Sequence, residues 1–176
     1  MGAKTIEDLL AKEAIRDLVL SYSRGVDRQD VALLRDLYTE DATDTHGTTF
    51  DGPAEAYCDF LEKSFPYMRY SGHHVCNHLI EVNGDTAHGE VYCIALHLLP
   101  DGSGGYLEDL LTVRYIDNYR RCEDGHWRFS KRKVTYDYNV RRPVGEDCIK
   151  DLPDRGKDPS YSQLASPLFQ RGGRHD

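Results

Sequence analysis

The spacing of apolar residues changes at Pro66, and this change restricts the chain to folds that keep helices and strands in separate parts of the sequence. Before Pro66, apolar residues recur every three or four positions, as on one face of a helix. Thr5 and Asp8 resemble a capping box at the start of the first helix, and Gly25 is a plausible end. The predicted helices are residues 6–24, 30–38 and 54–65.

After Pro66 the sequence is typical of long strands separated by turns. The candidate strands are residues 73–82, 86–99, 106–122 and 126–140. Helices followed by antiparallel hairpins define an α+β fold, and a curved antiparallel sheet closed by N-terminal helices forms a cone with a hydrophobic pocket. We therefore predict one domain over residues 1–140, with about five or six strands. Residues 141–176 are predicted to be an extended tail over the body or a neighbouring subunit, with a frayed end at 172–176.

The net charge and the cysteine content limit which classes of partner and which cellular compartment we expect. The net charge of -8 gives no basic surface for a nucleic-acid backbone, and no apolar run approaches the roughly 20 residues of a membrane-spanning helix. Five cysteines without a C-x-x-C pair, and an N-terminus without an apolar secretion segment, favour the cytoplasm. No glycine-rich phosphate loop opens a helix after a strand, so we predict no cofactor.

Three histidines lie within six residues of the first long strand and raise the possibility of a metal site. In a regular strand His74, Cys76 and His78 share one face, so three ligands could converge. No C-x-x-C pair, no H-x-x-x-H on a helix and no carboxylate at ligand spacing supports such a site. We therefore predict no metal, with His74 and His78 as polar strand residues beside His73.

Two charged residues are candidates for chemistry. Asp27 follows the predicted end of the first helix, but Asp30 is better placed to cap the next one. Asp27 is therefore available to hold an imidazole, fix its tautomer and stabilise the imidazolium. Strand alternation places Arg132 on the face of Tyr136 and opposite Phe129, where it is either a surface charge or a guanidinium for a developing anion.

Four segments, taken with the order of elements, carry a family resemblance. They are "GVD" at the end of the first helix, "HHVCNHLIEV" at the first long strand, "NGDTAHGEVYC" across a hairpin, and "EDGHWRFSKR" near the last strand. Over roughly residues 6–139 the sequence resembles a SnoaL-like member of the nuclear transport factor two-like superfamily. It is most similar to the branch that contains scytalone dehydratase, lindane dehydrochlorinase and bile-acid dehydratase.

This resemblance implies a cofactor-independent lyase. An Asp–His dyad would remove a proton from a hydrophobic cyclic, aromatic or polycyclic small molecule, with elimination of a leaving group. Aligning the segments implies Asp27, His73 and Arg132 as catalytic residues, although a β-bulge at the strand start would exchange His73 and His74. The expected substrate-binding residues are Tyr22, His74, Tyr92 and Tyr136.

Self-association and two other functions also follow from the resemblance. An open sheet face favours assembly, and the resembled enzymes imply a homotrimer. The same base could serve an isomerase, a cyclase or a carbon–carbon lyase. Alternatively, the fold serves as the non-catalytic small subunit of a ring-hydroxylating dioxygenase.

Overall fold

The computed structural model describes residues 5–152 and 154–173, and part of the predicted frayed end, residues 174–176, lies outside this description. Three helices precede most of the sheet, which confirms the predicted α+β class. They are α1 (Ile6–Asp27), α2 (Val31–Asp36) and α3 (Ala54–Ser64). The strands are β1 (Tyr38–His46), β2 (Phe50–Pro53), β3 (Tyr70–Asn83), β4 (Thr86–Pro100), β5 (Tyr106–Arg121) and β6 (Trp127–Val144). Within the described ranges, no helix combines the length and apolar character needed to cross a bilayer.

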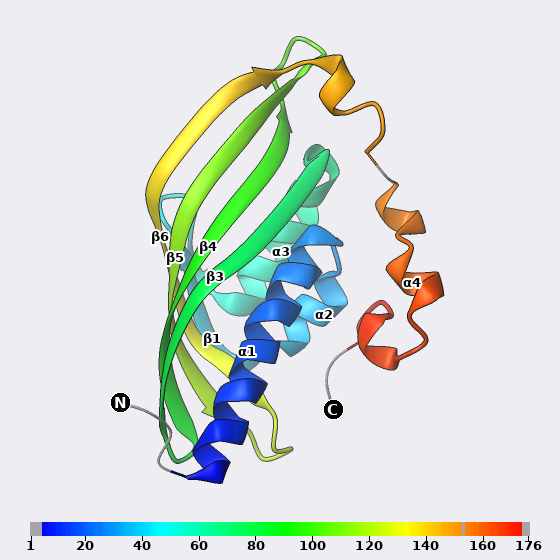
Figure 1. Cartoon of the computed structure of the whole chain (residues 1–176). Coiled ribbons are helices and arrows are strands. Elements are labelled where there is room, and N and C mark those ends of the chain that lie inside the picture. The colour runs from blue at the N-terminus through cyan, green and yellow to red at the C-terminus, as the bar shows by residue number, and fades with distance from the viewer. Residues whose placement is uncertain (1–4, 153, 174–176) are drawn as a thin grey trace.

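The six strands form one curved sheet in the order β2-β1-β6-β5-β4-β3. Strands β3 to β6 are antiparallel hairpins, as predicted. β1 and β2 were not predicted as strands, and β1 pairs with β6 in parallel, so the sheet is mixed rather than wholly antiparallel. Figure 1 shows the helices against the concave face of the sheet. The curved sheet and the helices enclose the interior from opposite sides.

Helix α1 is longer than predicted. Its start has the expected capping box, because Thr5 Oγ1 accepts from the Asp8 amide and an Asp8 oxygen accepts from the Thr5 amide. The helix passes through Gly25, where a Cβ atom would lie only 2.8 Å from Leu34 of α2. Glycine therefore permits close packing of α1 on α2 rather than ending the helix. As a result, Asp27 is the last residue of α1.

Strand β6 departs from simple alternation. Asn118 pairs with Lys131 while Tyr119 pairs with Phe129, so β6 contains an extra residue between these pairs. This bulge places Phe129 and Arg132 on the same inner face, and both are fully buried. The predicted opposition of Phe129 and Arg132 was therefore wrong.

The tail begins after β6 ends at Val144, four residues beyond the predicted boundary. It forms the short segments η2 (Glu146–Cys148), η3 (Arg155–Lys157), α4 (Ser160–Gln163) and η4 (Pro167–Phe169). Arg24 of α1 donates to the Phe169 carbonyl at 2.6 Å, and Arg28 pairs with Asp158 at 2.8 Å. The tail therefore folds over the chain's own helices, as Figure 1 shows on the side away from the sheet.

Candidate active site

A cavity of about 160 Å³ lies between the sheet and the helices. Much of its lining is apolar, with side chains from α1, α3 and the central strands. The lining also includes three histidines and four tyrosines: His46, His73, His97, Tyr22, Tyr57, Tyr115 and Tyr136. An apolar chamber with a few convergent polar groups is the usual form of a small-molecule site.

Asp27 and His73 meet at this cavity. An Asp27 oxygen lies 2.7 Å from His73 Nδ1, and the side chain of His73 is only 8% exposed. Asp27 also accepts from the Ser71 hydroxyl at 3.1 Å and from the His73 backbone amide at 3.0 Å. Both carboxylate oxygens are thus occupied, and the carboxylate is fixed against the ring by groups from one strand.

This contact determines the tautomer of His73. A carboxylate is only an acceptor, so Nδ1 of His73 carries the hydrogen in the bond to Asp27. The neutral ring then has its lone pair on Nε2, which makes no hydrogen bond to any described residue. Nε2 is the atom able to take a proton, while Asp27 stabilises the resulting imidazolium.

The orientation of His73 and His74 follows from their neighbours in β4. His73 is opposite Ala95, which is buried and lines the cavity, whereas His74 is opposite Ile94, which is 41% exposed. The bulge in β3 lies after Val75, beyond both histidines, so it does not exchange them. His74 is exposed on the outer face, away from the cavity where it was expected to bind substrate.

The expected tyrosines divide between the two faces of the sheet. Tyr22 and Tyr136 line the cavity. Tyr92 does not, because it alternates with the buried Val91 and Cys93 and points outward at 42% exposure. Its ring lies under the Arg114 guanidinium, 6.0 Å from ring centre to Cζ.

Arg132 lies behind the cavity wall rather than in it. It forms two hydrogen bonds to Asp117, at 2.8 and 2.7 Å, and both side chains are 0% exposed. Its guanidinium contacts the rings of Tyr22 and Tyr115, 4.1 and 4.4 Å from their centres, and both rings line the cavity. Burial opposes its charge, but Asp117 raises the pKa of Arg132 well above its usual value. The arginine expected to touch substrate instead supports the tyrosines that do line the site.

Sequence reasoning missed a second Asp–His pair at the same cavity. Nδ1 of His46 is hydrogen-bonded to Asp44, and Asp44 also accepts from Tyr38 at 2.7 Å. Nε2 of His46 lies 2.9 Å from the Tyr57 hydroxyl and 3.3 Å from that of Tyr22. The signal was present, since Asp44 and His46 are two apart and therefore share a strand face. It was hidden because "TEDATDTH" lacks the aliphatic residues that indicate a strand.

The tyrosines of this network are donors rather than bases. Burial raises the pKa of Tyr22; the Arg132 charge opposes this shift, and a smaller contribution from Asp44 adds to it. Burial, followed by the nearby Tyr22 and Asp44, raises the pKa of Tyr57 well above its ordinary value. Both hydroxyls therefore keep their protons at neutral pH and present O–H groups to the cavity.

The three-ligand arrangement of His74, Cys76 and His78 is not formed. The bulge after Val75 breaks the alternation that would align them, and His78 Nε2 instead lies 3.3 Å from the Tyr119 hydroxyl. Across residues 5–152 and 154–173, no group of three histidine, cysteine or acidic side chains is arranged to hold a metal ion.

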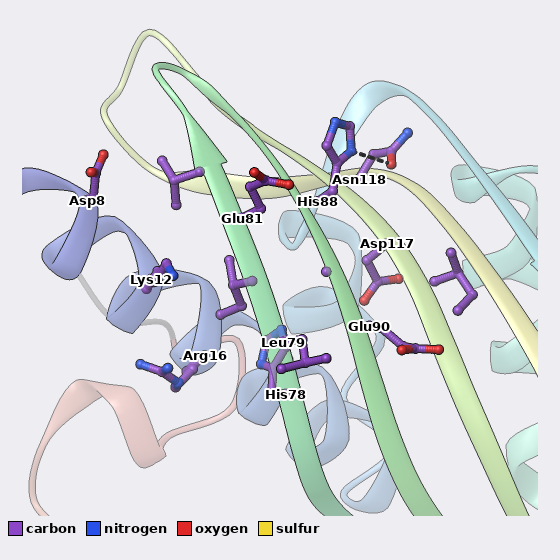
Figure 2. Close-up of a pocket in the computed structure, with 14 residues that line it drawn as sticks. Asp8, Lys12, Arg16, His78, Leu79, Glu81, His88, Glu90, Asp117 and Asn118 are labelled. Atoms are coloured by element: carbon purple, nitrogen blue, oxygen red, sulfur yellow. Dashed lines mark hydrogen bonds between the residues drawn. The ribbon is translucent and has the colours of Figure 1, made fainter. Parts of the chain in front are cut away.

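A larger groove, about 810 Å³, lies between α1 and the ends of β3 to β5. Figure 2 shows Lys12 and Arg16 along α1, and the acidic side chains of Glu81, Glu90 and Asp117 on the strands. Its histidines have neutral hydrogen-bond partners, His78 with Tyr119 and His88 with Asn118. Because no carboxylate holds either ring, the groove lacks the acid–base arrangement of the smaller cavity.

His78 is expected to make stability depend on pH. Burial, then the charges of Arg16 and Arg132, lowers its pKa from 6.5 to about 4. Between these values the unfolded chain binds a proton that the folded chain does not, so the free energy of unfolding falls as pH decreases from 6.5 to 4. His78→Gln should reduce this loss by about 1 kcal/mol, discounted for partial exposure. Urea unfolding at several pH values measures it, and parallel curves for both proteins would contradict it.

Comparison with known proteins shows which family has a sequence similar to this chain. The SnoaL-like domain family matches the chain over residues 7–133. No curated protein matches it significantly in sequence.

Solved structures with the same fold include three from Novosphingobium. A candidate scytalone dehydratase of N. aromaticivorans DSM 12444 is 23% identical, with TM-score 0.69, over 78% of this chain and 91% of that one. The hexachlorocyclohexane dehydrochlorinase LinA-type3 of N. barchaimii LL02 is 24% identical, with TM-score 0.70, over 85% of this chain and 99% of that one. A candidate aromatic ring hydroxylase of N. aromaticivorans is 25% identical, with TM-score 0.67, over 81% of this chain and 96% of that one. These likenesses establish the shared cone fold.

Proposed function

Because the chain belongs to the SnoaL-like domain family, we propose that it is a cofactor-independent lyase of the dehydratase type, acting on a hydrophobic cyclic small molecule. The observation that carries this proposal is the 2.7 Å contact between Asp27 and His73 Nδ1 at an apolar cavity. The names of two similar structures, a candidate scytalone dehydratase and a hexachlorocyclohexane dehydrochlorinase, support elimination as the reaction.

In the proposed reaction, Nε2 of His73 takes a proton from a carbon of the bound ring. Asp27 stabilises the imidazolium and prevents the ring from rotating, because it also holds the backbone of the same strand. The electrons of the C–H bond form a double bond as a leaving group departs from the adjacent carbon. A positioned base of this kind contributes about 10²–10⁴ in rate.

The cavity volume favours a small substrate. At about 160 Å³ it is close to the roughly 150 Å³ cavity that holds one benzene molecule. A single six-membered ring with small substituents fits this space. We therefore propose a monocyclic substrate rather than the polycyclic one that the family resemblance also allowed.

The test is an elimination assay with the purified protein. Hexachlorocyclohexane, which has a single ring, is followed by chloride release, and scytalone, which has two fused rings, by loss of water, each with and without a chelator. We expect turnover of the single-ring compound, unchanged by chelation, whereas turnover of scytalone alone would contradict the proposed substrate size. Activity that depends on an added metal would contradict the proposal, and so would inactivity on both probes with copurification of an iron-containing large subunit.

We also propose that the chain forms a homotrimer through the outer face of its sheet. Tyr92 and Ile94 of β4 and Ile116 of β5 are large apolar residues exposed together on this face. Light scattering on the purified protein should give three times the chain mass of 20.1 kDa. Ile94→Lys should lower that mass, because it places a charge in the apolar surface, while a wild-type monomer would contradict the proposal.

A further inference from the structure

We propose that Asp44, His46 and Tyr57 form a proton-donating relay that protonates a carbonyl oxygen of the substrate while His73 removes a proton from the neighbouring carbon. This inference rests on the proposed function and adds to it a second catalytic group, Tyr57, and a substrate class. That class is a cyclic compound with a carbonyl group beside the C–H bond that breaks.

The relay is a continuous hydrogen-bonded chain. Asp44 is fully buried, bonded to His46 Nδ1 and to the Tyr38 hydroxyl. His46 Nε2 lies 2.9 Å from the Tyr57 oxygen, and the two rings stack with centroids 4.3 Å apart. Tyr22 lies 3.1 Å from Tyr57, oxygen to oxygen. The chain runs from a buried carboxylate to hydroxyl groups that line the cavity.

The two Asp–His pairs enter the cavity from different parts of the sheet. His46 is on β1 and His73 is on β3, and three strands, β6, β5 and β4, lie between them in the sheet order. Because the sheet is curved, both side chains line the same chamber. A ring bound between them has a base on one side and an O–H donor on another, as enolisation of a ketone requires.

A purely structural role explains this network less well. A carboxylate in the interior is costly, and an apolar residue in its place often gives equal stability. Tyr38 bonds one oxygen of Asp44, and a second hydroxyl would be enough to bond the other, yet that place is taken by an imidazole. The imidazole between Asp44 and Tyr57 adds a group that can both accept and donate a proton, placed where its outer nitrogen meets a cavity-lining hydroxyl.

The proposed step balances in protons and electrons. With both nitrogens protonated, His46 donates through Nδ1 to Asp44 and through Nε2 to the Tyr57 oxygen. His73 Nε2 takes the proton on carbon, the C–H pair forms a carbon–carbon double bond, and the carbonyl π pair moves to oxygen. That oxygen takes the Tyr57 proton, and Tyr57 takes the His46 proton. The product is an enol. When it expels a leaving group from the next carbon, the enol O–H proton returns through Tyr57 to His46, and the proton held by His73 passes to the departing group, so both histidines regain their starting states.

The experiment uses cyclohexanone, a single-ring ketone, as the probe. Exchange of its α-hydrogens in D₂O is followed by NMR with the full-length protein. We expect the wild type to accelerate exchange and His73→Gln to abolish the acceleration. Tyr57→Phe and His46→Gln should each lower kcat by about 10²-fold or more with little change in KM. The double variant should be no worse than either single one, because the relay acts as a unit.

Controls separate the possible failures. His88→Gln changes a histidine that lies outside the cavity and is bonded to Asn118. This variant should catalyse exchange of the α-hydrogens at the wild-type rate. Tyr57→Phe keeps the stacked ring, so it serves if His46→Gln does not fold. Wild-type rates in Tyr57→Phe and His46→Gln, with loss in His73→Gln, would overturn the relay alone. A wild type no faster than buffer would overturn removal of a proton from carbon, and the relay with it.

Discussion

His73→Ala is expected to lower turnover in the elimination assay by a factor of about 10²–10⁴, because it removes the proposed base. The fold should remain intact, since Asp27 keeps its bonds to the Ser71 hydroxyl and to the backbone amide of residue 73. Chloride or product release measures turnover, and urea unfolding verifies stability. Asp27→Asn should also reduce turnover, because an amide can hold the ring in the wrong tautomer.

His74→Ala is the matched control for this prediction. It changes the adjacent residue of the same strand, exposed on the opposite face, and should leave turnover unchanged. Adding Asp27→Asn to His73→Ala should cost little more, because residues acting as a unit are not additive. Full activity in His73→Ala, combined with loss in His74→Ala, would refute the assignment of the base.

Arg132→Met is expected to destabilise the protein by about 3–5 kcal/mol. It leaves the fully buried carboxylate of Asp117 without its cation, and among the described residues only the Tyr119 hydroxyl, at 3.1 Å, remains as a side-chain hydrogen-bond partner. The midpoint of urea unfolding measures the effect. The double change Arg132→Met with Asp117→Leu should recover much of the stability, because it removes both charges together.

Arg114→Met provides the comparison for a partly exposed pair. Arg114 binds Asp137 and Glu90 on the outer face, where each side chain is about one-third exposed. Its loss should cost at most about 1 kcal/mol. Normal stability of Arg132→Met would contradict the prediction that this buried pair is needed for the fold.

The predicted parts of the fold are those that local patterns specify. Apolar spacing specified the helices, and turn residues such as Asn83 and Gly84 specified the hairpins of β3 to β6. β1 was missed because its strand identity depends on parallel pairing with β6, far along the chain. With β1 unrecognised, Asp44 and His46 could not be assigned to the cavity.

In the candidate site too, the residues predicted correctly are those marked by local sequence patterns. Asp27 and His73 were implied by short segments at recognisable ends of elements, and their contact is present in the structure. The position of Arg132 could not be deduced, because its partner Asp117 is on another strand and the bulge beside Phe129 has no clear sequence signature. The position of such a side chain depends on partners far along the chain and on bulges, and the local alternation of polar and apolar residues indicates neither.

The alternation of β3 also limits how this protein can evolve. Substitutions on the outer face can adjust solubility or assembly while the inner face keeps its chemistry, because His73 and His74 belong to different surfaces. Gain or loss of one residue just before His73 cannot be absorbed in this way. It would exchange the surfaces of His73 and His74, moving the proposed base out of the cavity. A change of length is therefore tolerated in the hairpin turns, or in a bulge such as the one after Val75, which lies beyond both histidines.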